Sequence, residues 1–240
     1  MRTGLLLFVV LTALLISMPA FAQTAIQPED LVVLSDGQEK YPLGRHLEIL
    51  RDPSGELTFQ DVTSAAYQDQ FHLSQVDTPN FGYQSAAYWV RFRVSNQSKQ
   101  SSRWVLELAF SNIHYLDLYL PSPEGASYQV KESGVLRPYE SRDIPYHHLS
   151  YILDIPPENE QSVYMRFQNA ASMTMPLNLW AQNAFIHHML LDQLGYGAFY
   201  GILLIMILYN SFLFFLIRDR GYLYLVLFTF SLTGTLFFYD

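Results

Sequence analysis

The sequence lacks cysteine and is poor in charge. None of its 240 residues is a cysteine, which excludes disulfide bonds, thiol nucleophiles and thiolate metal sites. Only 15% of the residues are charged, and acidic residues outnumber basic ones, so the net charge is −8. A nucleic-acid partner is thereby excluded, because contact with a phosphate backbone requires a basic face. The lack of cysteine does not exclude export from the cytoplasm, since a domain of this size can hold its core without disulfide bonds.

Catalytic motifs are missing as well. The chain has no GxSxG elbow, HExxH motif, P-loop or glycine-rich dinucleotide turn. The pairs His147-His148 and His187-His188 could suggest a metal site. However, adjacent side chains point in different directions on a strand and on a helix, so neither pair can chelate as it stands. Such histidines are more typical of turns and interfaces. The sequence therefore predicts no enzyme, no cofactor and no metal. A hydrolase that uses Glu107 and Asp117 as paired carboxylates remains as the enzymatic alternative.

Apolar residues, in contrast, are abundant. They make up 50% of the chain and aromatic residues 15%, which is more than a soluble domain needs and indicates that part of the chain lies in lipid. Residues 1–22 have the layout of a signal peptide: Arg2, an apolar run over 5–16, and Ala20-Phe21-Ala22 as the cleavage site. The alternative, a first membrane helix, is disfavoured because the run is short and ends at Pro19.

A transmembrane hairpin is predicted at the other end. Residues 194–217 and 222–239 carry no charge and are long enough to cross a bilayer, and 218–221 form the loop between them. Arg218 and Arg220 place this loop in the cytoplasm of a bacterial inner membrane, and the signal peptide independently places the preceding domain outside. Gly197 and Gly201 let a second helix approach, and a homodimer is one assembly that stays open. Because two helices offer each other few partners, we expect the natural protein to continue past Asp240.

Residues 23–185 are expected to form an all-β sandwich or jelly roll that folds by itself. Short runs of alternating apolar and polar residues are separated by turn-forming clusters, such as Asp52-Pro53-Ser54-Gly55 and Pro156-Pro157-Glu158-Asn159. One short helix is predicted over 58–66, capped by Thr58 or Asp61. The period of two assigns one face of each strand to the core, for example Tyr88-Val90-Phe92-Val94 and Trp104-Leu106-Leu108-Phe110.

The opposite faces of these strands carry the candidate site. They combine flat aromatic rings with guanidinium and carboxylate groups, which suits a sugar that stacks on rings and makes bidentate hydrogen bonds. The alternative is a solvated face with cross-strand ion pairs. Trp89 is expected to face solvent, so that its loss would weaken binding rather than stability. The candidate ligand-binding residues are Trp89, Arg91, Arg93, Glu107, Asp117, Tyr119, Tyr164 and Arg166.

Several of these stretches resemble one family over about residues 35 to 240. They are Asn80-Phe81-Gly82-Tyr83, Tyr88-Trp89-Val90-Arg91-Phe92, Trp104-Val105-Leu106-Glu107-Leu108, Leu116-Asp117-Leu118-Tyr119, Tyr164-Met165-Arg166-Phe167 and Pro176-Leu177-Asn178-Leu179-Trp180. In this order they resemble the extracellular type 2 domain of seven-transmembrane receptors with diverse intracellular signalling modules. Tyr200-Gly201-Ile202-Leu203, Leu208-Tyr209-Asn210 and the segment 218–224 resemble the opening of that family's membrane region.

The resemblance implies a periplasmic jelly roll akin to carbohydrate-binding modules. It also implies seven membrane helices and a cytoplasmic output such as a diguanylate cyclase or a histidine kinase. The expected partners are the membrane and a carbohydrate or related small molecule. We therefore expect the ligand-sensing part of a membrane signalling receptor. The alternative is a membrane-tethered carbohydrate-binding or assembly module that transmits no signal.

Overall fold

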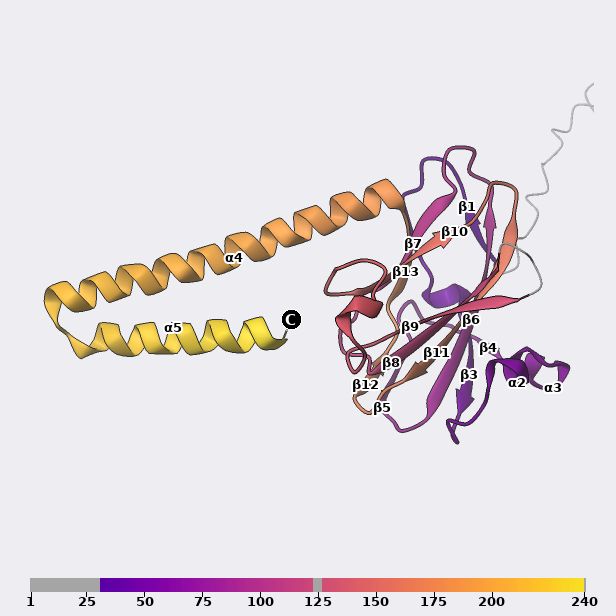
Figure 1. The fold of residues 1–240 in the computed structure, drawn as a ribbon, viewed down its shortest axis with the longest axis horizontal. Coiled ribbons are helices and arrows are strands. Elements are labelled where there is room, and N and C mark those ends of the chain that lie inside the picture. The colour runs from indigo at the N-terminus through magenta and orange to yellow at the C-terminus, as the bar shows by residue number, and fades with distance from the viewer. Residues whose placement is uncertain (1–30, 123–126, 240) are drawn as a thin grey trace, which may run out of the picture.

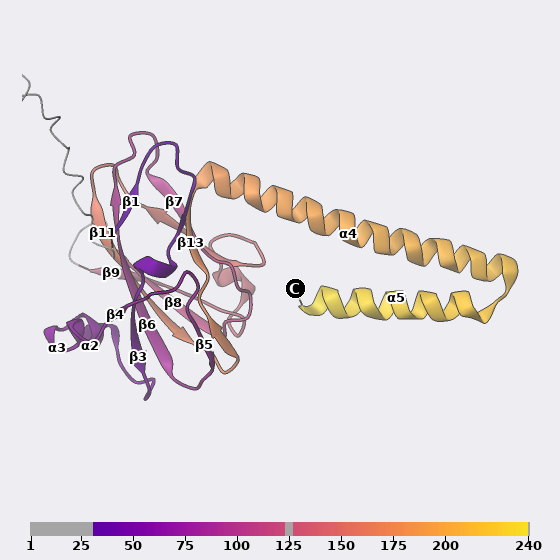
Figure 2. The same cartoon turned by 180° about the vertical axis from the view of Figure 1, so that it is seen from behind.

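The computed structural model describes residues 31–122 and 127–239. The predicted signal peptide lies outside the described residues. Within them, the chain forms a two-sheet sandwich that leads into two long helices (Figures 1 and 2). The predicted fold class, an all-β sandwich followed by apolar helices, is confirmed.

The larger sheet has the strand order β4-β3-β6-β11-β8-β9, and β1 pairs with β6 in parallel. Its other pairings are antiparallel. The bounds are β1 Leu31–Leu34, β3 Glu48–Asp52, β4 His72–Leu73, β6 Ala87–Asn96, β8 Tyr115–Pro121, β9 Tyr128–Ser133 and β11 Glu160–Gln168.

The smaller sheet has the order β10-β7-β13-β2 and is antiparallel throughout. Its strands are β2 Lys40–Pro42, β7 Arg103–Leu108, β10 Leu149–Asp154 and β13 Leu177–Ala181. A two-stranded ribbon, β5 Asn80–Tyr83 and β12 Ser172–Thr174, and the 3-10 turns η1 Gly44–His46 and η2 Tyr139–Ser141 complete the sandwich.

The main core lies between the two sheets, where the alternation predicts it. Tyr88, Val90, Phe92 and Val94 of β6 pack in one apolar cluster with Trp104, Leu106 and Leu108 of β7. Strands β8, β10, β11 and β13 add their inward residues to the same cluster. The phase predicted for β6 and β7 is therefore correct.

Two short helices, α2 Phe59–Thr63 and α3 Ala65–Gln68, cover part of the outer face of the larger sheet. Thr58 caps α2: its hydroxyl accepts from the Asp61 amide, and the Asp61 carboxylate accepts from the Thr58 amide, so both predicted residues form one capping box. Val62 of α2 is buried in a second apolar cluster with Leu50, Trp89 and Tyr164. The outer face of this sheet is therefore partly a second core.

The helix α4 runs from Gln182 to Ile217, and α5 from Arg220 to Tyr239. We expected helix only from 194, but α4 begins directly after β13, because Phe185 is buried against the outer face of the smaller sheet. Arg218 takes a left-handed backbone (φ 56°) in the short connection to α5. Helix α4 is long and apolar enough to cross a membrane. The use of α5 as a second span stays a prediction.

Candidate ligand-binding site

Most of the predicted site residues share one surface, the outer face of the larger sheet. Strands β6, β11 and β8 are neighbours, and the register places Arg166 of β11 between Trp89 and Asp117. Two positions further along, Tyr164 lies between Arg91 and Tyr119. Arg93 continues the same face of β6, opposite Ser162. Sequence alternation alone could not show that these strands are adjacent.

A pocket of about 680 Å³ opens on this face, a volume typical of small-molecule sites. Helix α2 and the residues before it form one wall, and strands β6, β8, β9 and β11 form the floor and the other wall. Four predicted residues line it: Trp89, Asp117, Tyr119 and Arg166. The others that line it are Leu57, Thr58, Phe59, Gln60, Thr63, Ser127, Tyr128 and Val130.

The aromatic part of the pocket is a cluster centred on Phe59. Its ring stacks on Tyr119 at a centroid distance of 4.5 Å and lies 4.7 Å from Tyr128. Tyr128 is 38% exposed, so it presents free ring surface to a ligand. Burial raises the pKa of both tyrosines, and the nearby Asp117 charge adds to the effect at Tyr119. Both phenols therefore stay neutral and can donate hydrogen bonds at neutral pH.

Trp89 does not face solvent, which corrects our expectation. Its side chain is fully buried beneath α2, 5.4 Å from the Tyr119 ring and 6.5 Å from Phe59. The strand phase is still right: Trp89 points away from the main core, but α2 covers it. The ring forms the floor of the pocket rather than an open stacking platform.

The polar part of the pocket is built around Asp117. Arg137 donates to its carboxylate and also to the backbone carbonyls of Leu116 and Ser133. Arg166 lies 3.9 Å from the other carboxylate oxygen and donates to the Gly55 carbonyl at 2.7 Å. Two arginines thus flank the Asp117 carboxylate. Their N–H donors and the carboxylate acceptor lie beside the aromatic cluster.

Arg91, Arg93 and Tyr164 line a separate, smaller hollow of about 320 Å³ with Glu48, Gln68 and Ser162. Arg91 makes a bidentate pair with Glu48 (2.8 and 3.0 Å), donates to Gln68 and lies over the Phe71 ring. Burial lowers the pKa of Arg91, but the Glu48 carboxylate outweighs it, so the pKa is raised. Arg91 therefore holds α3 against the sheet. The cross-strand ion pairs that we considered as the alternative are formed here and at Asp117–Arg166.

Glu107 does not belong to this surface. It lies on β7, on the outer face of the smaller sheet and across the core from Asp117, so the two carboxylates cannot act as a catalytic pair. Its oxygens accept from the Trp180 indole at 2.8 Å and contact His148 Nδ1 at 2.9 Å. His188 of α4 lies 3.9 Å away. Period-two alternation assigns a residue to an outer face but does not show to which of the two sheets its strand belongs.

Glu107 is nevertheless buried and charged. Burial alone raises its pKa, but the hydrogen bonds from His148 and Trp180 outweigh this and lower the pKa below its ordinary value. The pair His147-His148 thus lies at the junction between the sandwich and α4. His147 lies 3.5 Å from Asp192 of α4, and Tyr146 donates to the same carboxylate at 2.7 Å. Within residues 31–122 and 127–239, no group of three or more suitable side chains could hold a metal ion.

Sequence reasoning missed the residues that α2 and β9 bring to the pocket, above all Phe59 and Tyr128. The helix itself was predicted, but a short helix does not reveal the face on which it packs. One signal was available: Phe59 and Val62 are three residues apart, which predicts an apolar side that must cover something. Arg137, the partner of Asp117, lies in a loop and left no pattern.

Residues 44–181 match the family described as 7TMR-DISM extracellular 2, which is more than half of the chain. The chain belongs to this family. Residues 192–240 match a second family, 7TM diverse intracellular signalling, so the sandwich and the helices of this 7TMR-DISM protein carry the two matches in the order predicted from the sequence. No curated protein matches the chain.

Among solved structures, the 7TMR-DISM chain is similar to CsCBM6-3 from Clostridium stercorarium in complex with cellobiose. The two are 11% identical, with a TM-score of 0.24 over 43% of this chain and 81% of that one. A second similar structure comes from work on the promiscuous specificity of carbohydrate-binding modules from the β-sandwich superfamily. It is 10% identical, with a TM-score of 0.24 over 60% of this chain and 54% of that one. Likenesses this distant carry no argument about the ligand.

Proposed function

We propose that this 7TMR-DISM chain is the ligand-sensing part of a bacterial membrane receptor. The sandwich lies outside the cytoplasmic membrane, binds a carbohydrate or related small molecule in the pocket beneath α2, and passes the binding event to α4. The family membership supports a receptor. We assign no enzymatic role to the pocket: Asp117 is held between two arginines, and the neighbouring carboxylate, Glu132 of β9, shares Arg137 with it.

The composition of the pocket supports a saccharide. Tyr128 offers an exposed ring for stacking against a sugar face, and Gln60, Thr58 and Thr63 line the opposite wall with amide and hydroxyl groups. Asp117 and Arg166 add an acceptor and a donor at the floor. Because these opposite charges balance, the pocket suits a neutral saccharide or one with a single carboxylate.

The observation that carries the receptor function is the absence of a linker between the sandwich and α4. Strand β13 ends at Ala181 and α4 begins at Gln182. Phe185, one turn into the helix, is buried with Val105 and Tyr146. A rigid helix that is packed on the domain and continues into the apolar segment can transmit a displacement, whereas a flexible linker would absorb it. This favours a receptor over a tethered module.

Ligand binding is tested with the full chain in lipid nanodiscs on an array of neutral and uronic-acid oligosaccharides. We expect selective binding that Tyr128→Ala and Asp117→Asn each weaken at least tenfold. Tyr83→Ala is the matched control, because Tyr83 is an exposed aromatic residue (83%) outside the pocket. Binding that none of the pocket variants changes would place the ligand elsewhere, and no binding to any saccharide would exclude this ligand class.

Transmission is tested with the best saccharide from that array by hydrogen exchange. In a receptor, binding changes amide exchange both in 57–63 and in 182–196. In a tethered module, only the pocket segment responds. Orientation is tested with alkaline phosphatase fused after Asn183 or after Gly221: we expect activity only from the first fusion, because Arg218 and Arg220 favour a cytoplasmic loop. The reverse result would show that the orientation is wrong.

A further inference from the structure

The loop between β9 and β10, residues 134–148, is fixed against α4 at the level where the helix becomes uncharged. Tyr146 donates to Asp192 at 2.7 Å, and the His147 ring lies 5.5 Å from the Tyr196 ring. Asp192 precedes the uncharged segment, which starts at residue 194, by two residues, or about 3 Å along a helix. We call residues 134–148 the η2 loop. The contacts of Tyr146 and His147 place the C-terminal end of this loop at the boundary between water and the lipid that α4 would cross.

The η2 loop carries a small apolar surface that the sandwich does not use. Leu136 is 59% exposed, Tyr139 is 55% exposed and Val135 is 40% exposed. These three side chains therefore do not contribute to the core of the sandwich. Exposed apolar residues that gather on one loop are typical of a contact surface.

The backbone holds this apolar turn in place. The Val135 amide donates to the Ile113 carbonyl at 2.9 Å, and the Arg137 amide donates to the Gly134 carbonyl at 3.2 Å. Gly134 has φ 139°, and a Cβ there would lie 2.1 Å from the His114 carbonyl oxygen, so only glycine fits this approach. The turn therefore presents its side chains from a defined position.

The position of the η2 loop in the fold agrees with this placement. Figures 1 and 2 show the η2 loop on the side of the sandwich that points along the helices, toward the last turn of α5. Helix α5 has 20 residues, about 30 Å at 1.5 Å per residue, which is the thickness of the hydrocarbon core. Its last turn thus returns to the level at which α4 enters the apolar segment, and the η2 loop lies just beyond that level.

We propose that Val135, Leu136 and Tyr139 dock on the outer surface of the phospholipid bilayer that α4 spans. This proposal rests on the membrane topology of the proposed function. Leucine and valine insert between headgroups, and tyrosine prefers the interface because its ring is apolar and its hydroxyl is polar. The contact would hold the sandwich at a fixed height and tilt above the membrane, a reference against which α4 can move.

The charges near the turn indicate an apolar contact rather than an electrostatic one. Arg142 lies 4.8 Å from the centre of the Tyr139 ring, but its guanidinium donates to the Tyr146 and His147 carbonyls. Glu140 is exposed beside it, so the turn has no excess of positive charge. Docking is therefore expected on zwitterionic phosphatidylcholine and does not require anionic lipid.

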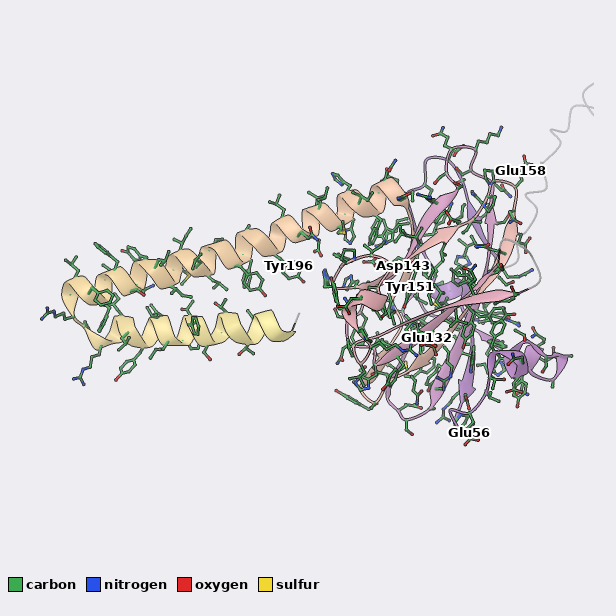
Figure 3. All side chains as sticks on the ribbon, viewed as in Figure 1. Glu56, Glu132, Asp143, Tyr151, Glu158 and Tyr196 are labelled. Atoms are coloured by element: carbon green, nitrogen blue, oxygen red, sulfur yellow. The ribbon has the colours of Figure 1, made fainter. Side chains whose placement is uncertain are left out.

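The absence of cysteine allows a clean depth measurement on the full chain. The polarity-sensitive dye NBD is attached to Leu136→Cys and, separately, to Tyr139→Cys in phosphatidylcholine vesicles with nitroxide-labelled lipids. Leu204→Cys on α4 reports the bilayer interior, since Leu204 is 56% exposed on the span. Glu56→Cys is the distal control, because Glu56 lies on the part of the sandwich away from the helices (Figure 3).

We expect headgroup nitroxides to quench the dye at 136 and 139 at least threefold more than at 56, while deep acyl-chain nitroxides quench it at 204. If 204 is quenched but 136 and 139 behave like 56, the span exists and the docking proposal is wrong. Iodide, a water-soluble quencher, tests whether the dye is exposed to solvent. If neither iodide nor the nitroxide lipids quench the dye at 136 and 139, a protein covers the turn, which also overturns lipid docking. If 204 is not quenched, the membrane topology fails, and the docking proposal fails with it.

Discussion

The Glu107 carboxylate on β7 accepts a hydrogen bond of 2.8 Å from the indole of Trp180, on the strand that runs straight into α4. The Trp180 ring in turn stacks on His188 at 4.8 Å, and His188 lies on the second turn of α4. One buried carboxylate therefore links the smaller sheet, its exit strand and the helix. The proposed ligand pocket lies across the core from this link, so in the proposed receptor a binding event would reach α4 through the sandwich.

Loss of Glu107 is predicted to destabilise the sandwich. Glu107→Ala leaves the half-buried Trp180 N–H and His148 without their partner, at an expected cost of about 1–3 kcal/mol. Glu107→Gln keeps an acceptor for Trp180 and is expected to cost less. The measurement is thermal unfolding of the full chain in detergent, with Glu56→Ala as an exposed control. Equal stability of Glu107→Ala and the control would show that the link carries no energy.

Acid is predicted to remove the contribution of the Glu107 charge. The folded pKa lies below the ordinary value of 4.5, so the charge stabilises the fold fully above that pH and loses its effect as the pH falls through the folded pKa. The difference in unfolding temperature between the natural chain and Glu107→Gln should therefore shrink as the pH falls below about 4.5. A gap that widens with acid would contradict the assigned direction of the shift.

The sequence predicts the strand phases correctly because alternation depends only on neighbours in the chain. Val90 and Phe92 enter the core, and Arg91 and Arg93 leave it, without any knowledge of the other strands. What lies over the outer face depends on contacts distant in sequence. Trp89 is covered by α2, some thirty residues earlier, and Glu107 by α4, some eighty residues later. Alternation carries no information about either contact.

Trp89 is predicted to matter for stability more than for direct binding. Its side chain is fully buried between Leu50, Val62 and Tyr164, so Trp89→Ala should cost about 3–5 kcal/mol. Trp89→Phe fills most of the space and should cost less, and saccharide binding by this variant should survive. Urea unfolding of both variants tests the difference. An alanine variant as stable as the natural chain would mean that α2 does not pack over this ring.

Arg91 and Glu48 are predicted to act as one unit. Both side chains are mostly buried, at 15% and 18% exposure, and they form two hydrogen bonds. Either single alanine variant leaves one charge without its partner and should cost about 3–5 kcal/mol, whereas the double variant should cost clearly less than the sum. Unfolding of the four proteins gives the coupling energy. Arg103→Ala with Asp154→Ala is the matched control, since that pair is exposed and also joins neighbouring strands. Coupling no larger than in the control would return Arg91 to the list of candidate ligand contacts.

The first turns of α4 are predicted to belong to the folding unit of the sandwich. A fragment that ends at residue 185 keeps Phe185 but loses Met189, which packs with it, and Asp192, which accepts a hydrogen bond from the Tyr146 hydroxyl. Tyr146 is buried, so its loss of a partner should cost about 1–3 kcal/mol in addition to the lost apolar contact.

Fragments 23–185 and 23–193 test this directly. The longer fragment should unfold at a higher urea concentration with the same cooperativity. Asp192→Ala in the longer fragment should lower its unfolding midpoint part of the way toward that of the shorter one. Leu191→Ala is the control, because Leu191 is 55% exposed on the same stretch of helix. If both fragments unfold at the same urea concentration, the helix is only attached to the sandwich. Movement of α4 would then not report on the state of the pocket, and the chain would have no rigid connection through which to transmit a signal.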